Sequence, residues 1–244
     1  GSLGPMARTV ADLAKCLDVI AGYDPDDPVT ARGVGHVPAS YSHILDDHAL
    51  RGARIGVLRE SIGARAEPDS DDFQRVTEVF DKAVGELREA GAVIVDPVVI
   101  DGLKPLLAKR AVNAAEEEEA FAAYFGRNRN APYKSREEGM RSPVFPRITR
   151  SAQARWRRTA PPLAHYDYLK AREALMTSFL KVMADHRLDA IVHKSVEHQP
   201  TLIAEGIQPP FVDQKGALSL NTFLVFVPSI SVPAGFSRDN LPAG

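Results

Sequence analysis

The most constraining feature of this sequence is a strand, a helix and a second strand that follow one another between residues 53 and 100. ARIGVL (53–58) is short and apolar, as is typical of a buried strand. Residues 68–91 have the spacing of an amphipathic helix, with acidic residues in the first turn and a glycine at the end. AVIVDPVVI (92–100) has the pattern of the second strand. This order predicts a right-handed βαβ crossover and an α/β fold, in which a mixed, mainly parallel sheet is flanked by helices.

A helix is also predicted near the start of the chain. Thr9 is a suitable N-cap residue, and Asp12 stands where the acidic residue of a capping box would lie. Apolar residues then recur at helical spacing until Gly22, which we expect to end the helix. Cys16 lies inside this segment, and we expect it to be buried.

The remaining pattern predicts two more helices and two more strands. Helices are expected over 103–126 and 165–187, and a short apolar strand is expected over 188–192. A final strand is expected within 221–236, where two prolines interrupt it. The segment 127–164 is rich in Arg and Pro and lacks a clear period, so loops and short helices are expected there.

Composition and charge are those of an ordinary globular protein and argue against a nucleic-acid-binding, membrane-spanning or disulfide-linked protein. The chain has 244 residues, of which 44% are apolar, and a formal net charge of -2, so no strong field favours nucleic acid or an anionic membrane. We find no apolar run of about 18 residues that would span a membrane, and no signal-peptide pattern. A single cysteine excludes an internal disulfide. We therefore expect a cytoplasmic protein without nucleic-acid or membrane partners.

Several blocks of this sequence resemble the amidase signature family. The opening GPMARTVAD (4–12) and IAGYDPDDP (20–28) are similar to a family segment that carries the same glycine, proline and aspartate positions. LRGARIGVLRE (50–60), LDAIV (188–192) and PSISVPAGFSRDNLPAG (228–244) resemble later family blocks in the same order. The resemblance covers the whole chain, strongly at both ends and weakly from 100 to 187. It implies an amidase signature fold and the hydrolysis of a small-molecule carboxylic amide.

Family members use a Ser–cis-Ser–Lys triad, in which a neutral lysine activates the serine nucleophile through a second serine. In the family this triad precedes the block that resembles residues 4–12, and we find no Gly-Gly-Ser cluster in this chain. We therefore expect residues 1–244 to be one partial, incomplete amidase domain, inactive alone, with no catalytic residue, cofactor or metal of its own. The expected partner is a second copy or the remainder of an amidase chain. The alternative is a non-catalytic binding or assembly module, similar to a fragment of an amidotransferase subunit.

The resemblance also suggests residues that would line the substrate pocket. Family members commonly carry a Pro-Thr pair after the late strand, where this chain has His193, Lys194 and Ser195. Ser195 is expected at the pocket rim. A substitute Lys194–Ser195 catalytic pair is disfavoured, because adjacent strand residues point to opposite faces. His193, Glu197 and His198 do not have the spacing that defines a zinc site.

Two further groups are candidates for substrate contact. Asn221, Thr222 and Phe223 precede the final predicted strand, in a loop that approaches the substrate in relatives. Phe145 and Trp156 lie in the segment 127–164, which in this family is variable and shapes the entrance. Basic residues around Trp156 also leave open a nucleic-acid surface, which the net charge disfavours.

Overall fold

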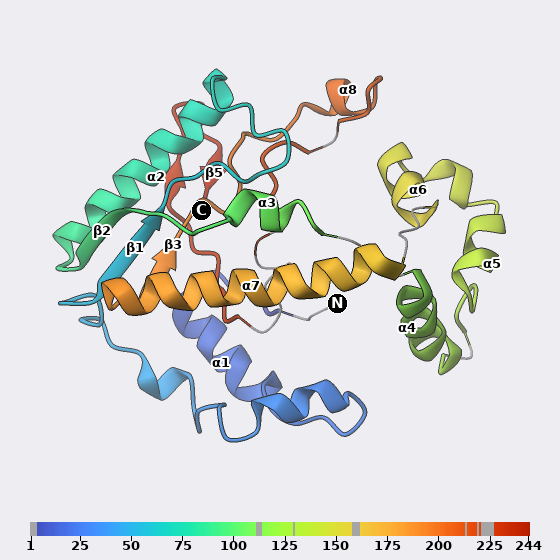
Figure 1. Cartoon of the computed structure of the whole chain (residues 1–244), viewed down its shortest axis with the longest axis horizontal. Coiled ribbons are helices and arrows are strands. Elements are labelled where there is room, and N and C mark those ends of the chain that lie inside the picture. Colours follow the sequence, from blue (N-terminus) through green and yellow to red (C-terminus); the bar gives the residue numbers. More distant parts are fainter. Residues whose placement is uncertain are drawn as a thin grey trace. The chain divides into compact units, whose positions relative to one another are not determined.

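The computed structural model describes residues 4–110, 114–128, 130–157, 162–212, 214–218, 220 and 227–244. The chain divides into two compact units, Gly1–Gly52 and Ala53–Gly244. Figure 1 shows the ribbon of the chain, with labels on many of its helices and strands. Within the described residues, no helix is both long and apolar enough to cross a membrane.

The first unit is built around the predicted N-terminal helix, α1 (Val10–Ile20). The Thr9 hydroxyl accepts a hydrogen bond from the Asp12 backbone N–H (3.1 Å) and donates one to the Asp12 carboxylate (2.8 Å), which confirms the predicted cap. Two short 3₁₀ helices follow, η1 (Pro28–Gly33) and η2 (Ser42–Ile44). Cys16 is exposed, so the prediction that it is buried was wrong. Its side chain lies outside the stripe around Ala14, the buried residue of α1.

Asp18 joins α1 to the segment around η2. Its carboxylate accepts hydrogen bonds from the Ser42 hydroxyl (2.5 Å), the Ser40 hydroxyl (3.1 Å) and the backbone N–H groups of Tyr41 and Ser42. The Ser42 hydroxyl is the main reason why the pKa of Asp18 is lowered, because these donors favour the charged form. The Asp18 carboxylate thus holds residues 40–42 against α1.

In the second unit, the three strands predicted at 53–58, 92–100 and 188–192 share one parallel sheet. They are β1 (Arg54–Leu58), β2 (Val93–Val98) and β3 (Ala190–Val192), in the order β2-β1-β3. The predicted mainly parallel α/β arrangement is therefore confirmed. Gly56 in the central strand is closely packed, since an added Cβ would lie 2.6 Å from Leu188 Cδ1 and 2.9 Å from Val98 Cγ1.

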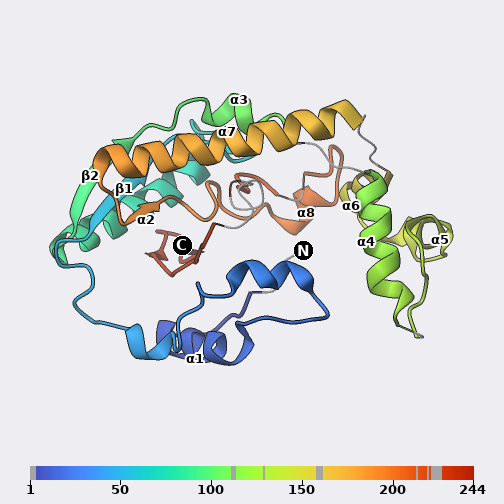
Figure 2. The ribbon, with the colours of Figure 1, turned by 60° about the horizontal axis from the view of Figure 1, so that its bottom comes forward.

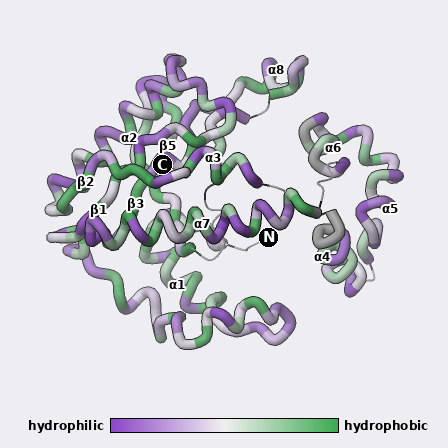
Figure 3. The backbone as a smooth tube through the Cα atoms, viewed as in Figure 1, coloured by the Kyte–Doolittle hydropathy of each residue, from purple (hydrophilic) through white to green (hydrophobic). Residues whose placement is uncertain are grey.

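The two faces of the sheet carry different helices (Figures 1 and 2). Helix α2 (Asp71–Glu89), capped by the Ser70 hydroxyl, packs Phe80 and Val84 against Val57 of β1. Helix α7 (Pro162–His186) and the short α3 (Leu103–Leu107) cover the other face. The larger core cluster lies there and contains Leu58, Val98, Ile100, Leu103, Ala171, Leu175, Val182, Leu188 and Leu220. Figure 3 shows hydrophobic and hydrophilic residues interspersed along α7. Ala171, Leu175 and Val182 are among its buried residues.

Two element predictions were wrong in extent. The segment 103–126 forms two helices, α3 and α4 (Ala114–Gly126). Helix α3 packs its leucines against α7 and then ends in a turn, in which the backbone N–H groups of Lys109 and Arg110 donate to the carbonyl groups three residues earlier. No strand is present over 227–234, where two prolines lack backbone N–H groups, and residues 221–226 lie outside the described part of the chain. The two-residue strands β4 (Gly235–Phe236) and β5 (Pro242–Ala243) instead form an antiparallel pair.

The segment 127–164 contains loops and short helices, as predicted. These are α5 (Arg136–Arg141), η3 (Phe145–Arg147) and α6 (Arg150–Arg157), with residues 129 and 158–161 undescribed. A further short helix, α8 (Ile203–Gly206), follows β3.

We predict that Leu175→Ala destabilises the protein by about 2–5 kcal/mol, because it leaves a cavity between α7 and the sheet. Leu175 has no exposed surface, whereas Leu180 on the same helix is 58% exposed. Equilibrium urea unfolding of both variants tests this expectation, with Leu180→Ala as the matched control. Equal, small losses for the two variants would show that the core is not where the structure places it.

Candidate functional site

The candidate site lies in the segment 193–201, which leaves the carboxyl end of β3. In open parallel sheets, ligands bind at the carboxyl ends of the strands, where loops from neighbouring strands meet. The segment is unusual because several of its polar residues are buried, namely Lys194, Glu197, His198 and Gln199. Buried polar groups require partners, and these partners define the site.

Glu197 joins the loop after β3 to the loop after β1. Its side chain accepts hydrogen bonds from the Ser61 hydroxyl (2.9 Å) and from the backbone N–H groups of Ile62 (2.9 Å) and Gly63 (2.8 Å). Its own backbone N–H donates to the Gly216 carbonyl (2.9 Å). Three loops therefore meet at one residue that is only 4% exposed.

Lys194 and Ser195 point to different neighbours. Lys194 Nζ donates to Thr77 Oγ1 (2.7 Å) on α2 and lies 3.8 Å from the centroid of the Phe73 ring. Burial lowers the pKa of Lys194, since the charged amine has lost water. Ser195 Oγ instead lies 2.5 Å from Ser231 Oγ. The two side chains thus have separate partners, as expected for adjacent residues of an extended segment.

A groove of about 390 Å³ lies beside this segment. Ser195, predicted at the pocket rim, lines it together with His198 and Gln199. Residues Leu241–Gly244 also line the groove, and the Gly244 carbonyl accepts a hydrogen bond from the Ser195 N–H (2.8 Å). The rest of the lining is Val76, Val196, Pro200, Thr201, Gln214, Lys215, Ala217 and Ser237.

Of the other predicted contact residues, Phe145 and Trp156 are not among the described residues that line this groove. Phe145 and Trp156 lie together, with ring centroids 5.8 Å apart, in an aromatic cluster that also contains Phe121 and Tyr133. Their contact with substrate stays a prediction. Asn221, Thr222 and Phe223 lie outside the described residues, and their role also stays a prediction.

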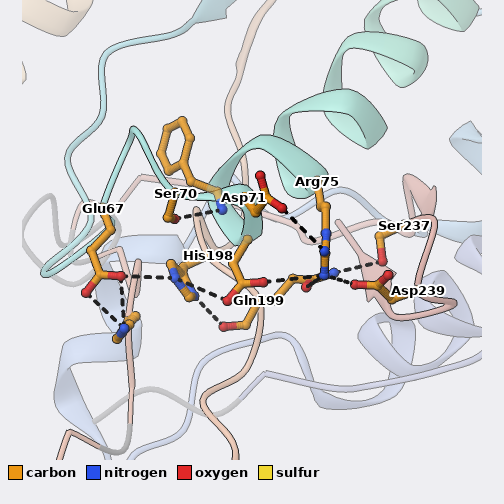
Figure 4. A network of polar contacts seen from close by, with 11 residues as sticks. Glu67, Ser70, Asp71, Arg75, His198, Gln199, Ser237 and Asp239 are labelled. Atoms are coloured by element: carbon orange, nitrogen blue, oxygen red, sulfur yellow. Dashed lines mark hydrogen bonds and ion pairs between the residues drawn. The ribbon is translucent and has the colours of Figure 1, made fainter.

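Figure 4 shows a polar network that local sequence patterns did not reveal. The Gln199 side chain accepts from the Ser237 hydroxyl (2.9 Å), and its amide nitrogen donates to Asp72 (3.0 Å) and Asp239 (3.3 Å). Arg75 on α2 pairs with Asp239 and lies 3.6 Å from both Asp71 and Asp72. The i,i+4 spacing of Asp71 and Arg75 is visible in the sequence, but Arg75 and Asp239 are 164 positions apart, so no local pattern indicates their contact.

The histidines of this segment have hydrogen-bonding partners within the chain. His193 Nδ1 lies 2.8 Å from the Lys194 carbonyl oxygen, and His198 Nδ1 lies 2.7 Å from that of Gln199. Among the described residues, no group of three or more His, Cys, Asp and Glu side chains is placed to hold a metal ion.

A parallel sheet between helices, with buried polar residues and a groove in the loops after its strands, is the arrangement of an α/β ligand-binding or catalytic domain. The family model described as Amidase matches residues 1–244, so the chain belongs to the amidase family.

Individual relatives agree with this assignment. The chain is 30% identical to a glutamyl-tRNA(Gln) amidotransferase subunit of Koribacter versatilis, over 99% of this chain and 50% of the relative. It is 25% identical to a probable amidase of Arabidopsis thaliana, covering 44% of that protein. Among solved structures, the native peptide amidase of Stenotrophomonas maltophilia is 28% identical, with a TM-score of 0.70, over 99% of this chain and 48% of that one. The chain thus spans about half the length of these relatives.

We predict that Glu197→Gln lowers the free energy of unfolding by about 1–3 kcal/mol, because an NH₂ group then faces backbone donors that need an acceptor. Thermal and urea unfolding measure the change. Glu205→Gln in the exposed helix α8 is the matched control and should leave stability nearly unchanged. Similar stabilities of the two variants would contradict the role of Glu197 as the junction of three loops.

We also predict a pH-dependent stability difference between the wild type and Lys194→Met. The folded state lowers the pKa of Lys194, so in the window below the unfolded value of about 10.4 the unfolded chain binds more protons. The wild type should therefore gain stability relative to Lys194→Met as the pH rises towards about 10. Urea unfolding across this range tests the sign, with Lys82→Met as an exposed control. If the free energy of unfolding of the wild type fell relative to that of Lys194→Met as the pH rose, a desolvated charge at this position would be refuted.

Proposed function

We propose that this chain forms the scaffold and one wall of the substrate cleft of an amide hydrolase. The reaction would convert a carboxylic amide to an acid and ammonia or an amine. The main support is the family match over 1–244, together with a solved relative named as a peptide amidase. In this proposal, the groove beside Ser195 is part of the substrate cleft.

We further propose that hydrolysis uses a Ser–cis-Ser–Lys triad whose residues lie outside these 244 residues. A serine nucleophile needs an adjacent base, and the developing oxyanion needs preorganised donors. Ser195 and Ser231 form a hydroxyl pair, but the nearby Lys194 amine is turned towards Thr77 and Phe73. This geometry supports a cleft wall better than a catalytic centre.

The alternative function is a binding or assembly module of an amidotransferase-like complex. It is favoured by the 30% identity to the relative that is named as an amidotransferase subunit. Exposed apolar side chains on α1 support contact with another surface, since Val19 is 84% and Ile20 is 58% exposed. A second copy of this chain or the remainder of an amidase chain would each fit such a surface. The cytoplasmic location expected from the sequence stays a prediction.

We predict that the purified 244-residue chain does not hydrolyse an aryl amide such as a 4-nitroanilide above background. The double variant Ser195→Ala/Ser231→Ala provides the background, because it removes the hydroxyl pair of the groove. Release of nitroaniline is followed by absorbance. Robust turnover that a serine-directed inhibitor abolishes would refute the proposed location of the triad.

Sequencing the coding frame ahead of residue 1 distinguishes the hydrolase from the binding or assembly module. A Gly-Ser-rich block with an upstream lysine in the same frame supports the hydrolase. A native start codon near residue 1 supports the binding or assembly module.

A further inference from the structure

Lys215 decides the charge of the groove beside Ser195. Among the described residues that line the groove, Lys215 is the only lysine, arginine, aspartate or glutamate. The other lining side chains are apolar, hydroxyl or amide groups and one imidazole. Whether the groove attracts an anion therefore depends on what neutralises the Lys215 amine.

The carboxylate of Glu67 neutralises this amine. Lys215 Nζ donates to Glu67 Oε2 at 2.9 Å and lies 2.9 Å from Oε1 as well. The same carboxylate lies 3.5 Å from His198 Nε2, at one end of the network in Figure 4. The Lys215 amine is the main reason why the pKa of Glu67 is lowered, so the carboxylate stays charged beside it. The pair therefore leaves the groove with little net charge.

The backbone holds the two partners of this pair together. Glu67 is half exposed, and exposed ion pairs are usually weak and mobile. Here, however, the Ala64 N–H donates to the Ala217 carbonyl (3.3 Å) and the Gly216 N–H donates to the Ala64 carbonyl (2.8 Å), which joins the two loops beside the pair. Glu67 itself has a φ of 53°, in the left-handed region that residues other than glycine rarely adopt. The loops thus place the carboxylate against the amine before any ligand binds.

A charged ligand would enter such a groove at a disadvantage. Its charge would lose water, and the Lys215 amine already has its counter-charge. A neutral amide loses less on leaving water, and the Ser195 hydroxyl of the groove can donate to a carbonyl oxygen or accept from an amide N–H. We propose that the groove takes an uncharged amide and that the Glu67–Lys215 pair determines this specificity by disfavouring both anions and cations.

This inference rests on the proposed function in one respect, which is that the groove forms part of the substrate cleft. It adds the class of substrate. Amides whose other groups are uncharged should be good ligands, because no part of them needs a counter-charge. Free amino-acid amides, which carry an ammonium group, and amides with a carboxylate should be poor ones.

The test uses three probes of nearly the same shape: benzamide is neutral, benzoate is an anion and benzamidine is a cation. Each probe is titrated at neutral pH into the ¹⁵N-labelled 244-residue chain. The dissociation constants are taken from the NMR shifts of the backbone amides of Ser195, Val196 and Gly244, which line the groove. Benzamide should bind about tenfold more tightly than either charged probe, because only the charged probes lose ionic hydration.

Variants that remove one charge of the pair should change this order in opposite directions. In Glu67→Gln the Lys215 amine loses its counter-charge, so benzoate should bind about fivefold more tightly than to the wild type, with benzamide unchanged. In Lys215→Met the Glu67 carboxylate loses its partner, so benzamidine should gain by a similar factor. The double variant Glu67→Gln/Lys215→Met carries neither charge and should keep the preference for benzamide. Lys82→Met, at an exposed position of α2, should behave like the wild type.

Equal dissociation constants for the three probes in the wild type, or groove amides that shift with none of them, would overturn the inference. Single-charge variants that keep the wild-type order would overturn the role of the pair. If one variant fails to fold, the wild-type order and the other variant decide. The result is separable from the proposed function, since a preference for benzamide upholds the inference even if no catalytic block lies ahead of residue 1. Conversely, charged probes that bind equally well overturn the inference and leave the hydrolase proposal standing.

Discussion

The structure of the larger unit depends on the position of β1 between two parallel neighbours. A strand that is paired on both edges and covered on both faces has no polar environment for its side chains, so Ile55, Val57 and Leu58 are almost fully buried. This burial requires a helix on each side, which α2 and α7 supply. It also brings the loops after β1 and β3 to the same edge, where Glu197 can reach the backbone at Ile62 and Gly63.

At that edge, two of the side chains that hold the loops together, His198 and Gln199, also line the groove. The carboxylate of Glu197 accepts hydrogen bonds from the 61–63 loop, and the amine of Lys194 donates a hydrogen bond to α2. His198 and Gln199 are engaged in the same way but also line the groove. A ligand in the groove would therefore meet side chains whose rotamers are already fixed, and little conformational entropy would be lost on binding.

The fold could be predicted from the sequence wherever local periodicity decides the structure. The strands at 53–58, 92–100 and 188–192 and the helix at 68–91 are short-range patterns, and each appears close to its predicted place. The single helix over 103–126 was wrong because its end depends on where α3 meets α7, which is a tertiary contact. The same limit applies to the site. The resemblance suggested Ser195, which lines the groove, and its contact with substrate stays a prediction. The pairs Arg75–Asp239 and Gln199–Ser237 join residues 164 and 38 positions apart, and no local pattern indicates them.

The glycine in the middle of β1 links three distant parts of the sequence. Its missing side chain leaves the space that Leu188 and Val98 fill. A bulkier residue at position 56 would be compatible with this fold only when positions 98 and 188 become smaller at the same time. Across related amidases, the three positions should therefore change in concert, with their summed volume conserved more strictly than any one residue identity.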